Sequence, residues 1–145
     1  MIEIAMVISK DGFPLATAFG SPGLVVFPQE YMWETHKRFP GLLQVMAHTH
    51  PFGLTELSEE DRTTLKAWTF AIYPYAIAMD VICKTLTGIS HKRYWYDIES
   101  REDWIARGKQ GERQMMLKQT DLSGISMTTW VHEILRLSEN VELMQ

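Results

Sequence analysis

Cysteine is almost absent from this chain, because Cys83 is the only one among its 145 residues. A single thiol can form neither an intramolecular disulfide nor a cysteine-rich zinc knuckle, so neither stabilises the fold. Long hydrophobic runs are absent too. The longest, residues 70–79, is interrupted by Pro74 and is shorter than the ~20 residues that a membrane helix needs. The sequence therefore excludes a disulfide-rich scaffold and predicts no membrane partner.

A basic excess is missing as well. Lysine and arginine together number 14, against 18 aspartate and glutamate residues, and the net charge is −4 with neutral histidines. Proteins that bind a nucleic-acid backbone usually carry a basic surplus, so we expect no nucleic-acid partner. The first residues also lack a basic start followed by an apolar run, which makes a cytoplasmic location the expectation.

The composition, with 46% hydrophobic and 22% charged residues, is ordinary for one compact domain. Apolar stretches alternate with helical patterns, so the expected fold class is α/β (α+β). We interpret residues 1–145 as a single domain with a core over about 1–98 and a helical extension over about 99–145. The expected strands are 2–8, 15–19, 24–27, 42–48, 76–83 and 93–98, and the expected helices are 28–39, 58–70 and most of the chain after residue 100, with a break near 122–124.

The segment from His48 to Asp61 carries the pattern most suggestive of chemistry. In a strand, side chains two residues apart lie on the same face, so His48 and His50 point the same way. Pro51 favours an extended backbone at His50 and keeps that geometry to the end of the strand. Two neutral imidazoles make half of a tetrahedral zinc site. Asp61, in the first turn of the next helix, can add a carboxylate, and a catalytic site leaves the fourth position to water.

Each of these residues also has a purely structural interpretation. A His-x-His pair is often two ordinary strand residues, and Ser58 with Asp61 three positions later has the pattern of a helix capping box. The ordered set is much more specific than its parts: His-x-His-Pro, a serine eight residues after the second histidine, and an aspartate three residues further on.

That set resembles the signature of the JAMM (MPN+) zinc metalloproteases, His-Ser/Thr-His-Pro followed by Ser-x-x-Asp, and the match covers positions 48–61 without a gap. The resemblance implies a cytidine-deaminase-like mixed β-sheet flanked by helices, and one Zn²⁺ with a bound water on His48, His50 and Asp61. It also implies that Ser58 supports the oxyanion. The implied activity is that of an isopeptidase or peptidase, deubiquitinase-like, which hydrolyses amide bonds at the C-terminal tail of a ubiquitin-like or sulfur-carrier-like protein. The compact size is similar to that of prokaryotic JAB-type members.

The family takes its general base from a glutamate upstream of the histidine pair, and this chain offers Glu3, Glu30 and Glu34. Glu30 and Glu34 lie four residues apart on an expected helix, as a solvated stripe does. Glu3 is the only carboxylate in the apolar stretch 2–8, where an unpartnered charge is costly. We therefore expect Glu3 to be the base, with Glu30 and Glu34 as the alternatives.

Two other classes of protein remain open, namely a non-catalytic scaffold of the same fold and a RadC-like protein associated with DNA. The complete ligand set argues against the scaffold, and the acidic charge argues against DNA. A purely structural zinc site would need a fourth protein ligand. None stands at a convincing spacing, because His36, His91 and His132 have no ligand-spaced partner nearby. The sequence predicts no oligomeric state.

Overall fold

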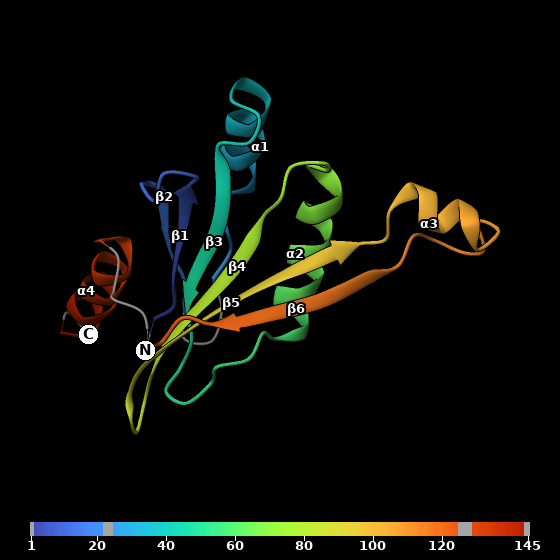
Figure 1. Cartoon of the computed structure of the whole chain (residues 1–145). Coiled ribbons are helices and arrows are strands. Elements are labelled where there is room, and N and C mark those ends of the chain that lie inside the picture. Colours follow the sequence, from blue (N-terminus) through green and yellow to red (C-terminus); the bar gives the residue numbers. More distant parts are fainter. Residues whose placement is uncertain (1, 22–24, 125–128, 144–145) are drawn as a thin grey trace.

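The computed structural model describes residues 2–21, 25–124 and 129–143 (Figure 1). The chain is a mixed α/β protein, as expected, with one six-stranded mixed sheet flanked by helices. In chain order the elements are β1 (Ile4–Ser9), β2 (Pro14–Phe19), α1 (Gln29–Arg38), β3 (Leu43–Thr49), α2 (Glu59–Ala71), β4 (Ala78–Thr85), β5 (Gly88–Ile98), α3 (Arg101–Ala106), β6 (Met115–Asp121) and α4 (Thr129–Leu143).

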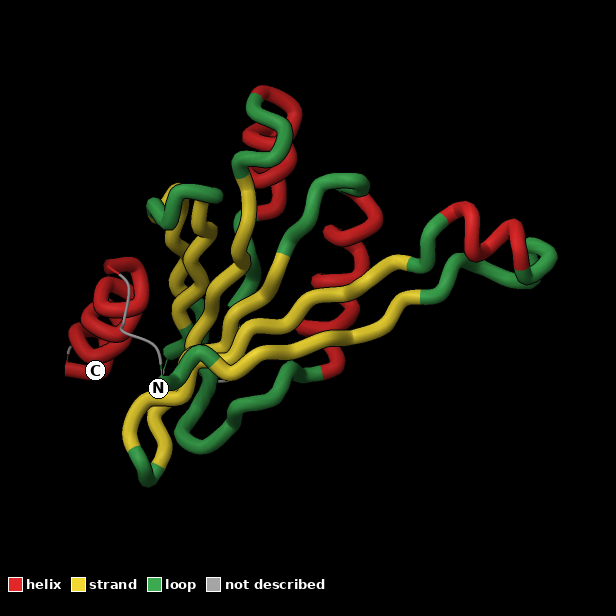
Figure 2. The backbone as a smooth tube through the Cα atoms, in the orientation of Figure 1, coloured by secondary structure: helices red, strands yellow, loops and turns green. Residues whose placement is uncertain are grey.

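The strands lie in the order β2-β1-β3-β4-β5-β6 (Figure 2). Only β3 and β4 run parallel, and every other neighbouring pair is antiparallel. A tight turn cannot join two parallel strands, so the chain must cross over the sheet between them, and α2 makes that crossover. The carboxyl end of β3 therefore leads directly into the loop and helix that complete the candidate site.

Alternate residues of the central strands bury against different helices, because successive side chains in a strand point to opposite faces. The first face packs beneath α1 and α2 through Ala5, Val7, Met46, Met32, Leu65 and Trp68, among others. The second face packs beneath α4 through Ile4, Met6, Ile8, Val45, Trp130, Val131 and Ile134, among others. Both faces of β1 and β3 are thus covered, which explains why these strands are mostly apolar and do not alternate between apolar and polar residues.

Two expectations about secondary structure need correction. The expected helical pattern after residue 100 is right for α3 and α4 but wrong for Met115–Asp121, which form the edge strand β6. Most of β6 is exposed, so it has no apolar alternation, and only its pairing with β5 defines it as a strand. In the expected strand 24–27, Leu24 lies outside the described residues, and residues 25–27 form no strand.

The chain after residue 98 is integrated with the sheet. The β5–β6 pair extends away from the rest of the sheet with α3 at its tip, and α4 covers the face opposite α1 and α2 (Figure 1). Within the described residues, no helix is both long and apolar enough to cross a membrane.

The packing of α4 generates a stability prediction. Ile134 is fully buried between α4 and the sheet. We expect Ile134→Ala to lower the free energy of unfolding by about 2–5 kcal/mol, because it leaves a cavity in a two-sided core. His132→Ala, on the exposed side of the same helix, should change it by less than about 0.5 kcal/mol. Urea unfolding measures both variants, and equal stabilities would contradict the docking of α4.

Candidate metal centre

Strand β3 places the two histidines of the motif on one face of the sheet. His48 lies in β3, and the His50 amide continues the ladder one residue beyond it by donating to the Ile82 carbonyl at 3.0 Å. The extended backbone therefore holds up to His50, as the Pro51 argument predicts. Both side chains are nearly inaccessible to solvent, and the Phe27 ring packs edge-on against the His48 ring.

The start of α2 supplies the third residue. Ser58 is the N-cap, and its hydroxyl accepts the Asp61 amide at 3.0 Å. In return, Asp61 Oδ2 accepts the Ser58 amide at 2.9 Å, which completes a capping box. The structural interpretation of Ser58 and Asp61 is thus correct, and it is compatible with a metal site because the box fixes the orientation of the Asp61 carboxylate.

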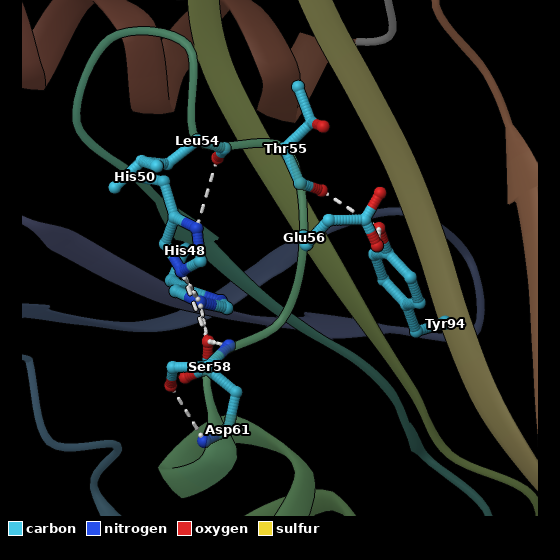
Figure 3. Close-up of polar contacts among 8 residues, drawn as sticks. All are labelled: His48, His50, Leu54, Thr55, Glu56, Ser58, Asp61 and Tyr94. Atoms are coloured by element: carbon cyan, nitrogen blue, oxygen red, sulfur yellow. Dashed lines mark hydrogen bonds and ion pairs between the residues drawn. The ribbon is translucent and has the colours of Figure 1, made fainter.

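Three potential ligand atoms converge at this point (Figure 3). The Nε2 atoms of His48 and His50 lie 2.8 Å apart, and Asp61 Oδ2 lies 3.1 Å from the first and 3.0 Å from the second. Around a tetrahedral ion with bonds of about 2.0–2.1 Å, ligand atoms are about 3.3 Å apart. The observed triangle is therefore only slightly too small, and the three residues can hold a metal ion.

The protonation of the site favours a cation as well. His50 Nδ1 lies 3.1 Å from the Leu54 carbonyl, and a carbonyl only accepts, so Nδ1 carries a proton. In neutral His50 the lone pair then lies on Nε2, which faces His48 and Asp61. The Nε2 lone pair of neutral His50 and the Asp61 carboxylate thus face one point, and His48 Nε2 lies within hydrogen-bond distance of both. A divalent ion there would accept electron pairs from all three residues.

The electrostatics of the three residues reflect this arrangement. Burial acts to raise the pKa of Asp61, but hydrogen bonds with His48 and His50 outweigh it and hold that pKa well below its ordinary value. Burial acts to lower the pKa of His50, yet the hydrogen bond and charge of Asp61, with the charge of Glu3, raise it overall. The centre therefore attracts positive charge strongly.

A cavity of about 370 Å³ opens beside these atoms. Part of its wall is apolar and part carries carboxylates. Its lining consists of Glu3, Val25, Val26, Phe27, Gln29, His50, Pro51, Leu54, Ser58, Glu60, Asp61 and Thr64. Volumes of this size are typical of small-molecule and peptide sites.

Glu3 lies on the wall of this cavity, next to the histidine pair. The β1–β3 register pairs Ala5 with His48, and continuing it by two residues sets Glu3 opposite His50 on the same face. Glu3 is only 6% exposed. Burial raises its pKa above the ordinary value, against the opposing charges of His50 and His48.

The alternative bases lie elsewhere. Glu30 and Glu34 are on α1, both are exposed, and neither lines the cavity beside the metal centre. Glu34 forms an ion pair with Lys37 at 2.8 Å. Of the three glutamates considered from the sequence, the structure brings only Glu3 to the candidate site.

Several residues of the site carry no recognisable signal in the sequence. Thr49, the middle residue of His-Thr-His, points to the opposite face, where its Oγ1 accepts the Ile4 amide at 2.9 Å and ties the start of β1 to the end of β3. Phe27 lines the cavity from outside the 48–61 segment, whereas Leu54 and Glu60 line it from within that segment. Only the fold brings Phe27 to the motif, so a sequence-local pattern cannot reveal it.

The remaining buried histidine belongs to a separate cluster. His91 Nε2 lies 2.6 Å from Asp80 Oδ2, and Arg93 binds the same carboxylate through two nitrogens at 2.8 and 2.9 Å. His91 contacts Trp130 of α4, so the cluster lies on the other face of the sheet. Within the described part of the chain it adds no ligand to the metal centre, and a fourth protein ligand is absent there.

Comparisons of the chain with protein-family models, with curated proteins and with solved structures found no match. The interpretation of the site therefore depends on its geometry, its donor atoms and the motif between His48 and Asp61.

The ligand set generates a binding prediction. We expect the purified protein to bind about one divalent ion per chain and His48→Ala or Asp61→Ala to weaken that binding by at least about 100-fold, because each removes a ligand. Calorimetric titration and metal analysis after dialysis measure this. His132→Ala, which removes an exposed histidine, is the control. Wild-type affinity in Asp61→Ala would exclude the carboxylate as a ligand.

Proposed function

We propose that this protein is a zinc-dependent hydrolase of amide bonds, an isopeptidase or peptidase of the JAMM type. The observation that carries the proposal is the convergence of three ligand atoms, from His48, His50 and Asp61, beside a cavity whose wall holds a buried glutamate. Two nitrogen ligands and one carboxylate oxygen form a donor set found in catalytic zinc sites, which keep a fourth position for water.

Zinc bound there would lower the pKa of a coordinated water to roughly 7 and polarise a substrate carbonyl. The residues of the chain perform the remaining tasks. Glu3 accepts a proton from the attacking water and returns it to the departing amine. Its burial supports this role, because a raised carboxyl pKa lies closer to the pH at which the group must both take and give a proton.

Ser58 stabilises the oxyanion in this proposal. Its Oγ already accepts the Asp61 amide, so the hydroxyl proton is directed elsewhere, and the residue lines the cavity. A hydroxyl whose oxygen is held by a backbone hydrogen bond is pre-organised, which is what makes such a donor effective.

The proposed substrate is the extended C-terminal tail of a ubiquitin-like or sulfur-carrier-like protein. A cavity of about 370 Å³ accepts a few residues of extended chain but no folded domain, so the scissile bond must lie on a projecting segment. Apolar side chains such as Val26 and Leu54 flank the centre and can hold such a segment.

Charge argues against an anionic substrate. The described residues that line the cavity include the carboxylates of Glu3, Glu60 and Asp61 and no lysine or arginine. A phosphodiester needs positive charge beyond the metal itself. The lining thus supports amide chemistry over the RadC-like alternative, and a complete three-ligand set supports an enzyme over a scaffold.

The general base has a direct test. We expect Glu3→Gln to keep its zinc but to lower kcat at least about 100-fold, because the amide cannot take the proton. The assay follows release of a fluorescent amine joined by an amide bond to the tail of a ubiquitin-like protein. Glu34→Gln, at an exposed ion pair of α1, serves as the control. A Glu3→Gln enzyme as active as wild type would move the base to another group: a loss of activity in Glu34→Gln would then identify Glu34, and otherwise Glu30→Gln is examined next.

Ser58→Ala tests the oxyanion role. We expect kcat to fall by about 10²–10³-fold, as after loss of an oxyanion donor elsewhere. The change also removes a helix cap, which costs about 1 kcal/mol of stability. Ser100→Ala is the matched control, since Ser100 caps α3 in the same way through the Asp103 amide at 3.0 Å, far from the site. If both variants lose only stability, Ser58 is a cap and nothing more.

A further inference from the structure

The loop between His50 and Ser58 determines the geometry of the centre, although it contributes no metal ligand. The Leu54 carbonyl accepts the His50 Nδ1 proton at 3.1 Å, and the loop ends at Ser58, whose amide binds Asp61 Oδ2. Residues 51–57 form neither helix nor strand. A backbone hydrogen bond from the Gly53 amide to the Lys84 carbonyl of β4, at 2.9 Å, holds the first half of the loop, and side-chain contacts hold the second half at Thr55 and Glu56.

Strand β5 supplies the anchor for the second half (Figure 3). The Tyr94 hydroxyl lies 2.8 Å from the Thr55 carbonyl and 3.1 Å from Glu56 Oε2. Lys92, two residues earlier on the same strand, donates to Glu56 Oε1 at 3.1 Å and to Thr55 Oγ1 at 3.4 Å. Thr55 directly follows Leu54, so the anchor lies one residue from the carbonyl that orients His50.

Tyr94 is suited to this task. It is 1% exposed within the core beneath α2, and its rigid ring carries one polar atom at the tip, directed at the loop. Burial, followed by the hydrogen bond and charge of Glu56, raises the pKa of Tyr94 above its ordinary value. The hydroxyl therefore keeps its proton and remains a donor to the loop.

We propose that Tyr94 is a positioning residue for the metal centre: it holds the loop so that the Leu54 carbonyl selects the His50 tautomer with a free Nε2 lone pair. The inference rests on the proposed function, because it assigns a purpose to the geometry of that same centre. Groups that orient metal-bound histidines typically alter affinity by 10–100-fold when they are removed.

Tyr94→Phe tests the proposal, with Tyr96→Phe as the matched control. Tyr96 lies two residues further along β5 on the same face and is also buried, but its hydroxyl has no hydrogen-bond partner among the described residues. We expect Tyr94→Phe to weaken Zn²⁺ binding by about 10-fold and Tyr96→Phe to leave it within about twofold. Competition with a chromophoric chelator measures both affinities, and circular dichroism checks that both variants are folded.

The His50 ring supplies a second readout that a purely structural tyrosine would not change. Nitrogen NMR of the metal-free protein, at a pH high enough to keep the ring neutral, reports which ring nitrogen carries the proton. We expect the Nδ1–H form of His50 in wild type and in Tyr96→Phe, and a mixture of tautomers in Tyr94→Phe. Unchanged zinc affinity and an unchanged His50 ring in folded Tyr94→Phe would overturn the inference.

The two proposals can fail separately. If wild type binds no Zn²⁺, the proposed function is wrong, and the His50 tautomer measured by NMR alone tests the role of Tyr94. If wild type binds Zn²⁺ and Tyr94→Phe behaves as wild type, the function stands and the positioning role is wrong. Should Tyr94→Phe not fold, Lys92→Met decides, since Lys92 is partly exposed and reaches the same loop. A loss of affinity of about threefold supports the anchor, and wild-type affinity overturns it.

Discussion

The pairing of β3 with strands on both of its sides is the constraint on which the candidate site depends. On one side β1 runs antiparallel to β3, and this register carries Glu3 to the position opposite His50. On the other side β4 runs parallel to β3, which requires the chain to cross over the sheet. The crossover passes through α2, and the first turn of α2 places Asp61 beside the carboxyl end of β3. The candidate metal ligands and the proposed base thus meet because β3 has one antiparallel and one parallel neighbour.

The Asp61 carboxylate combines a structural and a chemical task in a single oxygen. Oδ2 accepts the Ser58 amide of the capping box and faces both imidazoles. The cap pre-orients this ligand before any ion arrives, which lowers the entropic cost of assembling the centre. An ion that binds only the folded chain would stabilise the fold by mass action.

Much of the fold follows from local patterns. The apolar strands β1 and β3, the helix that begins after Ser58 and the apolar stripe of α4 all lie close to their expected positions. Each of these elements is buried on at least one side, so the apolar residues in its sequence follow the pattern of a strand or a helix. The edge strand β6 is exposed and has no such period, so the helical prediction for these residues is wrong. Its hydrogen bonds to β5 are non-local, and no local pattern records them.

The sequence by itself determined the candidate ligand set, because a strand periodicity of two and a capping box of fixed spacing place His48, His50 and Asp61 within one short segment of chain. It also singled out Glu3 as an isolated carboxylate in an apolar strand. Only the tertiary structure decided that Glu3 faces the same cavity, that Thr49 ties β1 to β3, and that Tyr94 reaches the loop. Those contacts join residues 39 to 45 positions apart, as in Tyr94 to Thr55 and Ile4 to Thr49. Contacts at such separations follow from strand order and register, which depend on the packing of the whole sheet.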